Sequence, residues 1–179
     1  MSQPAASPLL PTIAFIGGGN MASAIIGGLI HQGHPASQIE VVEPWAEARE
    51  ALRKNYGIEA QAEAGPALQR AQIVVWAVKP QTFRDAAAQA KAHTQGALHL
   101  SVAAGIRSDS IAQWLGTERI VRTMPNTPAL VGKGMSALYA RPAVSAPERQ
   151  SIEAIMATTG EFLWVDSEPQ LDAVTALSG

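Results

Sequence analysis

The sequence predicts an α/β fold with a doubly wound, mostly parallel sheet, followed by the start of a helical C-terminal domain. Short apolar runs rich in β-branched residues alternate with helical segments of about 10 to 15 residues, which is the order of a parallel sheet with right-handed crossovers. The three glycines at 17–19 separate the first apolar run from an Ala- and Ile-rich segment. Strand, tight turn and helix therefore follow one another at the start of the fold.

The expected strands are short. The run 72–78 is nearly continuous in apolar residues, which is typical of a strand buried on both faces of a parallel sheet, and Pro80 ends it. After Met124 the pattern changes to a loop rich in proline and glycine, and two more strands follow it. The predicted strands are 12–16, 39–42, 72–78, 97–102, 119–123, 135–140 and 161–165.

Helices are expected between these strands. Pro44 is well placed in the first turn of the helix after 39–42, because the first turn leaves its N–H groups without helical partners and proline has none. The predicted helices are 21–30, 44–55, 81–93, 108–115, 147–158 and a last one from Glu168 onward.

Composition excludes several classes of function. The formal net charge of -2 provides no field that would gather nucleic acid. The absence of cysteine excludes disulfides, thiolate catalysis and thiolate metal sites. His31, His34, His93 and His99 show no paired ligand spacing, so we expect surface or helix-end positions for them and no metal site. Without a signal peptide or an apolar run of about 18 residues, the sequence predicts a cytoplasmic protein that does not enter a membrane.

The glycine turn carries the first functional prediction. Gly17, Gly19 and Ala22 fit GxGxxA, in which the first glycine permits the turn, the second admits a pyrophosphate and the small third residue lets helix and strand pack closely. The helix N-terminus then presents free N–H groups and its dipole to the negative charge. The alternative is a glycine turn that binds nothing. Because a complete βαβ unit surrounds the motif, we favour a Rossmann-type site for a nicotinamide dinucleotide.

Glu43 stands at the end of the second strand. There a carboxylate can accept hydrogen bonds from the 2′ and 3′ hydroxyls of the adenosine ribose, and it would repel a 2′-phosphate. This interpretation favours NADH over NADPH. The alternative is that Glu43 only stabilises the next helix N-terminus through its dipole.

Two further segments end predicted strands, where open α/β sheets bind ligands. Lys79, within Ala77-Val78-Lys79-Pro80, can donate to a cofactor phosphate or ribose, or it is a solvated lysine. The small residues around Val102, Ala103 and Ala104 can let a flat nicotinamide ring lie against the backbone, or they serve tight helix packing.

Taken in order, five segments resemble the pyrroline-5-carboxylate reductase family. They are FIGGGNMA at 15–22, AVKPQ at 77–81, SVAAGI at 101–106, RTMPNTPA at 122–129 and DAVTALSG at 172–179. The resemblance implies hydride transfer from NADPH or NADH to the C=N bond of 1-pyrroline-5-carboxylate, giving L-proline, with the hydride chemistry supplied by the cofactor.

The resemblance also assigns site residues. It implies pyrophosphate binding by Ile16, Gly17, Gly18, Gly19, Asn20 and Met21, and contact of Glu43 with the ribose. It implies a nucleotide cleft that is lined by Ala77, Val78, Lys79, Pro80, Val102, Ala103 and Ala104. It places Met124 and Asn126 near the nicotinamide and the imine, and it names no catalytic acid.

The sequence departs from the family pattern at two positions, Glu43 and Ala64. Relatives often have a small polar residue at Glu43 and prefer NADPH, and they often carry Asn where Ala64 aligns, on the adenine side.

We expect a disordered leader at 1–11, an NAD(P)-binding domain at 12–166, and at 167–179 the first helix of a truncated domain that forms a homo-oligomer in the parent. Alone, this chain is expected to be inactive. The alternatives are a β-hydroxyacid dehydrogenase or imine reductase relative, and a non-catalytic nucleotide-sensing regulator.

Overall fold

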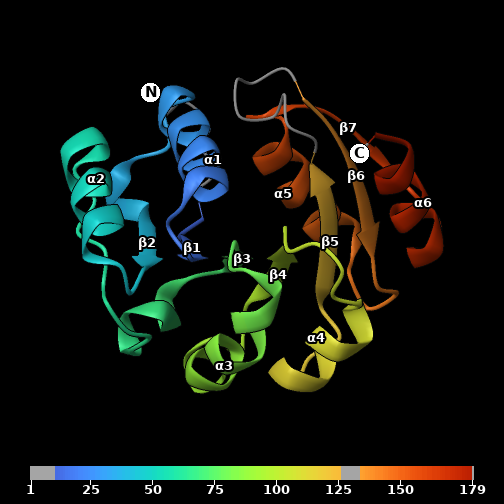
Figure 1. Cartoon of the computed structure of the whole chain (residues 1–179), viewed down its shortest axis with the longest axis horizontal. Helices are drawn as coiled ribbons and strands as arrows, with labels where there is room; N and C mark the ends of the chain where they lie inside the picture. Colours follow the sequence, from blue (N-terminus) through green and yellow to red (C-terminus); the bar gives the residue numbers. More distant parts are fainter. Residues whose placement is uncertain (1–10, 126–133, 179) are drawn as a thin grey trace, which may run out of the picture.

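The computed structural model describes residues 11–125 and 134–178 and contains a seven-stranded sheet in the order β2-β1-β3-β4-β5-β6-β7. The first five strands are parallel, β6 runs antiparallel to β5, and β7 is parallel to β6. This arrangement confirms the doubly wound, mostly parallel sheet (Figure 1). The strands are β1 (Ile13–Ile16), β2 (Ile39–Val42), β3 (Ile73–Trp76), β4 (Leu98–Ser101), β5 (Ile120–Pro125), β6 (Gly134–Ala140) and β7 (Gly160–Trp164).

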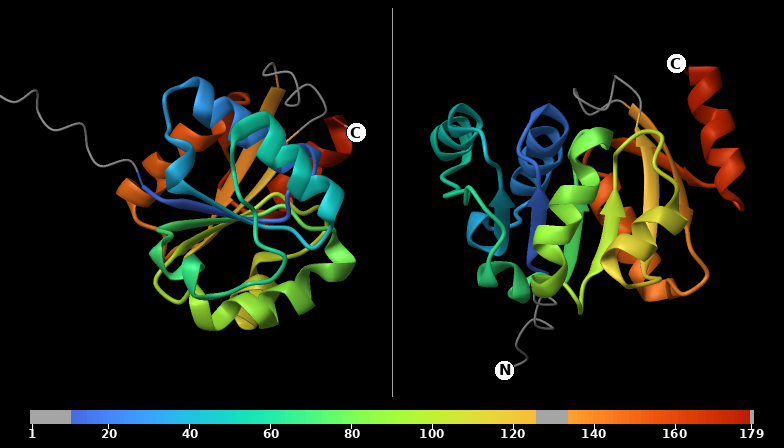
Figure 2. Two further views of the ribbon diagram at one scale, coloured as in Figure 1. Left: turned by 90° about the vertical axis from the view of Figure 1, so that its left-hand side faces the viewer. Right: turned by 60° about the horizontal axis from the view of Figure 1, so that its bottom comes forward.

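Helices lie on both sides of this sheet, which the edge-on view in Figure 2 shows. Three short 3-10 helices stand in the connections, at Ala36–Gln38, Pro66–Arg70 and Lys91–His93. The sequence did not predict the first two, and the third is the end of the helix predicted at 81–93. The α-helices are α1 (Asn20–His31), α2 (Ala46–Tyr56), α3 (Pro80–Ala90), α4 (Ser108–Leu115), α5 (Ala146–Met156) and α6 (Glu168–Ser178).

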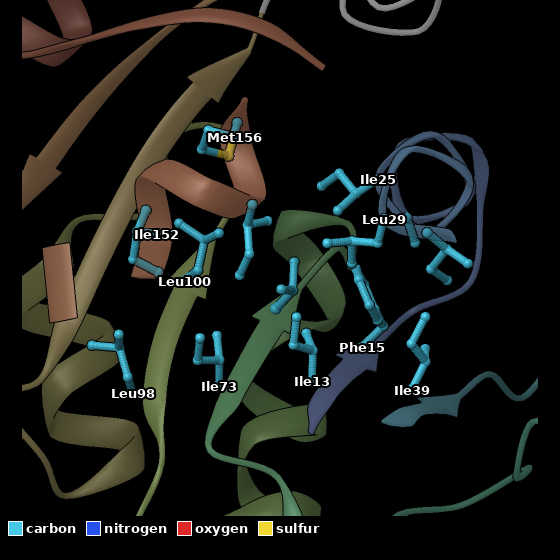
Figure 3. Close-up of a cluster of buried hydrophobic side chains, with 14 of the residues drawn as sticks. Ile13, Phe15, Ile25, Leu29, Ile39, Ile73, Leu98, Leu100, Ile152 and Met156 are labelled. Atoms are coloured by element: carbon cyan, nitrogen blue, oxygen red, sulfur yellow. The ribbon is translucent and has the colours of Figure 1, made fainter. Parts of the chain in front are cut away.

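Alternate residues of β1 pack into two separate cores, one on each face of the sheet. Phe15 and Ile13 of β1 belong to the core on the side of α1, α2 and α5, and Figure 3 shows Phe15 below Ile25 of α1 and Ile152 of α5 beside Leu100. Ala14 and Ile16, the residues between and after them, belong to the opposite core under α3 and α4. Because successive side chains of a strand point to opposite faces, an unbroken apolar strand supplies both cores at once.

Two prolines stand near the starts of helices, and one of them differs from its expected position. Helix α2 begins at Ala46, so Pro44 precedes the helix and the expected position in its first turn was wrong. The reason is local: the Glu43 side chain accepts the N–H of Trp45, which keeps the backbone extended there until the helix begins. Pro80 follows β3 as expected and occupies the first turn of α3.

The expected surface or helix-end positions were wrong for His34 and His99. His99 lies in β4 and is 1% exposed, and its Nδ1 accepts a hydrogen bond of 2.9 Å from the Trp76 indole. Burial lowers the pKa of His99 to about 4, so the imidazole is neutral and fits an apolar core. His34, just beyond α1, is also buried. His31 and His93 do end helical segments, at α1 and at the 3-10 helix before β4.

The described residues contain neither a membrane-spanning helix nor a cluster of metal-binding side chains. None of the helices in these residues has the length and apolar character that crossing a membrane requires. The same part of the chain brings together no group of three or more His, Asp or Glu side chains able to hold a metal ion.

Candidate functional site

A cleft of about 530 Å³ opens at the carboxyl ends of β1, β2 and β3. Its walls come from the glycine turn, the segment after β2, the segment after β3 and one side of α3. In an open α/β sheet this is the position where ligands bind. The predicted site residues that line it are Ile16, Gly17, Gly19, Glu43, Ala77, Val78 and Lys79.

Gly17 joins the ends of three strands. Its φ is +100°, and a Cβ added there would lie 2.4 Å from the backbone oxygen of Ala77, which follows β3. On the other side its N–H donates to the carbonyl of Val42 in β2, at 2.8 Å. Both the positive φ and the closeness of Ala77 exclude a side chain, so only glycine fits this position.

The N-terminus of α1 is open to an anion. Gly19 is its N-cap residue, no side chain of the described residues caps it, and its first turn contains no acidic residue. A Cβ added to Gly19 would meet no atom within 4 Å. The first N–H groups of a helix have no partners within the helix and carry its positive dipole end. This arrangement fits a pyrophosphate, which supports the predicted role of the turn.

Glu43 is fixed by two backbone groups. One carboxylate oxygen accepts the N–H of Gly18 at 2.8 Å, and the other accepts the N–H of Trp45, the N-cap residue of α2, at 2.9 Å. The contact with Trp45 places the carboxylate at the start of α2, as the second interpretation of Glu43 supposed. Each carboxylate oxygen retains acceptor capacity, so Glu43 still has lone pairs for a ribose hydroxyl.

Three charged side chains line the cleft. Lys79 ends the segment after β3 and is exposed, and Asp85 faces the cleft from α3. With Glu43, they give the lining two carboxylates and one ammonium group. The Arg49 guanidinium lies close by, and its Nη1 donates to the carbonyls of Glu43 and Pro44 at 2.9 and 2.7 Å.

The remaining predicted site residues that the structure describes do not line this cleft. Gly18, Asn20 and Met21 belong to the same turn and first helical turn, and Pro80 begins α3. The segment after β4 contains Val102, Ala103 and Ala104, and Met124 lies in β5. These four residues are outside the lining of the cleft. Asn126 lies outside the described residues. Site roles for all of these residues stay predictions.

A buried polar network at the other end of the sheet was missed. Arg122 of β5 is 1% exposed, and its guanidinium contacts the Glu168 carboxylate at 2.7 Å. Glu168 also accepts from the backbone N–H and the hydroxyl of Ser108, at 2.5 and 2.7 Å. Burial raises the pKa of Glu168, but the Ser108 bonds and the Arg122 charge outweigh it and hold that pKa below its ordinary value. The sequence feature that could have indicated this network is Arg122, a charged residue inside a strand that is otherwise mostly apolar.

Comparison with known proteins places this cleft in a family. Residues 12–105, which contain the glycine turn, Glu43 and the segment after β3, match the model of the family described as NADP oxidoreductase, coenzyme F420-dependent. That match covers more than half of the chain. The chain belongs to this family. All residues that line the cleft lie within the region that matches this NADP oxidoreductase family.

Individual relatives share a narrower description. The chain is 45% identical over 171 residues to the pyrroline-5-carboxylate reductase of Pseudomonas aeruginosa, covering 94% of this chain and 63% of that protein. The structure of a pyrroline-5-carboxylate reductase from Coxiella burnetii matches with a TM-score of 0.90 at 34% identity, over 95% of this chain and 64% of that one. The Plasmodium falciparum pyrroline carboxylate reductase with NADP bound shares the fold, with a TM-score of 0.81 at 24% identity, over 94% of this chain and 62% of that one. The chain thus spans less than two thirds of the length of these relatives.

Proposed function

We propose that this chain provides the dinucleotide-binding part of a pyrroline-5-carboxylate reductase. The reaction is hydride transfer from NADPH or NADH to the C=N bond of 1-pyrroline-5-carboxylate, giving L-proline. The observation that carries the proposal is the 45% identity with the Pseudomonas aeruginosa reductase over 94% of this chain. The cleft supports it, because the glycine turn and the uncapped start of α1 fit a pyrophosphate.

The chain's own residues would bind and orient the cofactor. The backbone N–H groups at the start of α1 face the pyrophosphate, and Gly17 keeps the turn against β3 so that these groups stay in place. Lys79, on the opposite wall, offers a donor to a phosphate or ribose oxygen. The bound nicotinamide supplies the hydride, and the protein contributes position and charge.

We also propose that α6 begins the helical region found in longer reductases. The helix packs against β5 and β6, and Leu171 in its first turn is fully buried there. Glu168 ties the same turn to Arg122. A region attached to α6 would therefore lie at the β5–β6 side of the sheet. Met124 is in β5, on that same side.

Cofactor binding is tested by titrating the chain with NADH and with NADPH while following nicotinamide fluorescence. Two substitutions at Gly19 form a matched pair. Gly19→Ala adds a Cβ that meets no protein atom but lies where the second glycine admits the pyrophosphate, so it should weaken binding and leave the unfolding midpoint unchanged. Gly19→Asp adds a negative charge facing the pyrophosphate and should weaken binding at least about tenfold, with an unchanged unfolding midpoint. Wild-type chain that binds neither dinucleotide would contradict the proposal.

Reduction of the imine needs a separate assay. A fusion of this chain to the C-terminal third of the Pseudomonas aeruginosa reductase should oxidise the cofactor when 1-pyrroline-5-carboxylate is added. A fusion that binds the cofactor but reduces nothing would favour a nucleotide-sensing regulator. Oxidation of a β-hydroxyacid, without imine reduction, would favour the dehydrogenase alternative.

A further inference from the structure

The wall of the cleft beyond β2 carries an exposed indole beside a fixed carboxylate. Trp45 is 62% exposed and lines the same cleft as Glu43. Its own N–H donates to the Glu43 carboxylate, so the backbone of Trp45 and the side chain of Glu43 are held together. A large aromatic ring on a cleft wall offers a flat apolar surface on which a purine base can stack.

The Glu43 carboxylate has a defined position and remaining acceptor capacity. Its contacts with the N–H groups of Gly18 and Trp45, at 2.8 and 2.9 Å, hold one end at the glycine turn and the other at α2. Because a carboxylate accepts hydrogen bonds and donates none, it suits a pair of ribose hydroxyls. A phosphate ester on the same ribose would bring a second negative charge against it.

The charges around the cleft act in the same direction. Its lining holds Glu43 and Asp85 against the single ammonium of Lys79. Arg49 is the cation beside Glu43, and its Nη1 is engaged by the carbonyls of residues 43 and 44. The Glu43 carboxylate repels a 2′-phosphate at this end of the cleft, and in Glu43→Gln the Arg49 guanidinium would be the charged group nearest to such a phosphate.

We propose that Trp45 and Glu43 together recognise the adenosine half of the dinucleotide, with Trp45 stacking on the adenine and Glu43 accepting the ribose hydroxyls. The chain therefore selects NADH over NADPH. This inference rests on the proposed dinucleotide binding and adds to it the choice of cofactor and the residue that stacks.

The test is a side-by-side titration with NADH and NADPH, followed by tryptophan fluorescence and by heat of binding. Wild-type chain should bind NADH at least about tenfold more tightly than NADPH. In Glu43→Gln the ratio should fall toward one, mainly through tighter NADPH binding. Glu47→Gln removes the same charge from an exposed position in the first turn of α2 and should leave the ratio unchanged.

Trp45 has its own pair of variants. Trp45→Ala should weaken both dinucleotides by about fivefold or more and to a similar extent, because stacking does not distinguish the two riboses. Trp45→Phe keeps an aromatic ring and should recover most of that affinity. It should also reduce the quenching of tryptophan fluorescence expected on binding, because Trp45 is the tryptophan that lines the cleft.

The outcomes separate this inference from the proposed function. Equal binding of NADH and NADPH by wild-type chain, or tighter NADPH binding, would overturn the role of Glu43 while leaving dinucleotide binding intact. Unchanged affinity in Trp45→Ala would overturn the stacking role in the same way. Wild-type chain that binds neither dinucleotide would overturn both the proposed function and this inference.

Discussion

At the β1–β3 side of the sheet, the glycine turn is held by close packing against neighbouring backbone, whereas the β5–β6 side is held by a buried pair of charged side chains. Figure 1 shows these two groups of strands on opposite sides of the sheet. Gly17 fits because it lacks a side chain, and Arg122 fits because Glu168 neutralises it. The first side depends on shape and the second on charge balance. Substitutions and pH should therefore affect the two sides differently.

The largest effect is expected at the β5–β6 side. Glu168→Ala should lower the free energy of unfolding by about 3–5 kcal/mol, because it leaves the buried Arg122 guanidinium without its main partner. Urea unfolding followed by circular dichroism measures the loss. Asp172→Asn is the control: Asp172 is 3.5 Å from the same guanidinium but its side chain is 57% exposed, so the change should stay below about 1 kcal/mol.

The same carboxylate predicts an acid dependence. The folded-state pKa of Glu168 lies below its ordinary value, so its contribution is present above the unfolded pKa and is lost as the pH falls through the folded pKa. The stability difference between wild type and Glu168→Ala should shrink in that acidic range. A difference that is constant down to the acid limit would contradict the ionic role.

A second pH effect comes from His99 in the centre of the sheet. Between its ordinary pKa of 6.5 and the folded value of about 4, the unfolded chain binds a proton that the folded chain does not. Unfolding is therefore favoured as the pH falls, by on the order of 3 kcal/mol in total. Urea midpoints measured across this range should fall in wild type and much less in His99→Gln, which retains an acceptor for Trp76. His34, whose pKa burial also lowers, contributes equally to both proteins.

At the β1–β3 side, Gly17→Ala should cost about 2 kcal/mol or more. Part of the cost is the left-handed backbone, and the rest is the contact with the oxygen of Ala77. Gly33→Ala separates the two parts, since Gly33 has a φ of +95° and nothing within 4 Å of an added Cβ. It should show the backbone cost alone, about 1–2 kcal/mol. Equal losses in the two variants would mean that the Ala77 contact relaxes without cost.

The smallest effect is expected for an exposed ion pair. Glu50 and Arg53 contact each other on the surface of α2, with side chains 59% and 55% exposed. Glu50→Gln should leave the unfolding midpoint unchanged within error at moderate salt, because water already solvates both charges. A clear loss of stability would show that burial is not what distinguishes this pair from Arg122 and Glu168.

The two sides also differ in how far the sequence predicts them. The glycine turn was predictable because Gly17 and Gly19 answer a local backbone requirement within one short motif. The network was not, because Arg122 and Glu168 are 46 residues apart and Ser108 and Glu168 are 60 apart, and no periodic pattern relates them. The burial of His99 was missed for the same reason, since its indole partner is 23 residues earlier on a neighbouring strand.

Glu43 shows an intermediate case. The order of the elements predicts its position at the end of β2. That order does not show whether Glu43 binds a ribose or stabilises the start of α2. Local sequence cannot show that one carboxylate contacts both Gly18 and Trp45, because those contacts depend on how the turn after β1 meets the segment after β2. Both interpretations of Glu43 therefore stayed open at the level of the sequence.

The pairing of Arg122 with Glu168 also orders events during synthesis of the chain. A ribosome adds Arg122 well before Glu168, at about 5–20 residues per second. Until α6 has left the exit tunnel, closing the sheet would bury a guanidinium without its counter-ion, which is strongly unfavourable. The strands that form the cleft can pair earlier, since their contacts lie within residues already made. The contacts of the nucleotide side can therefore form before the contact between Arg122 and Glu168.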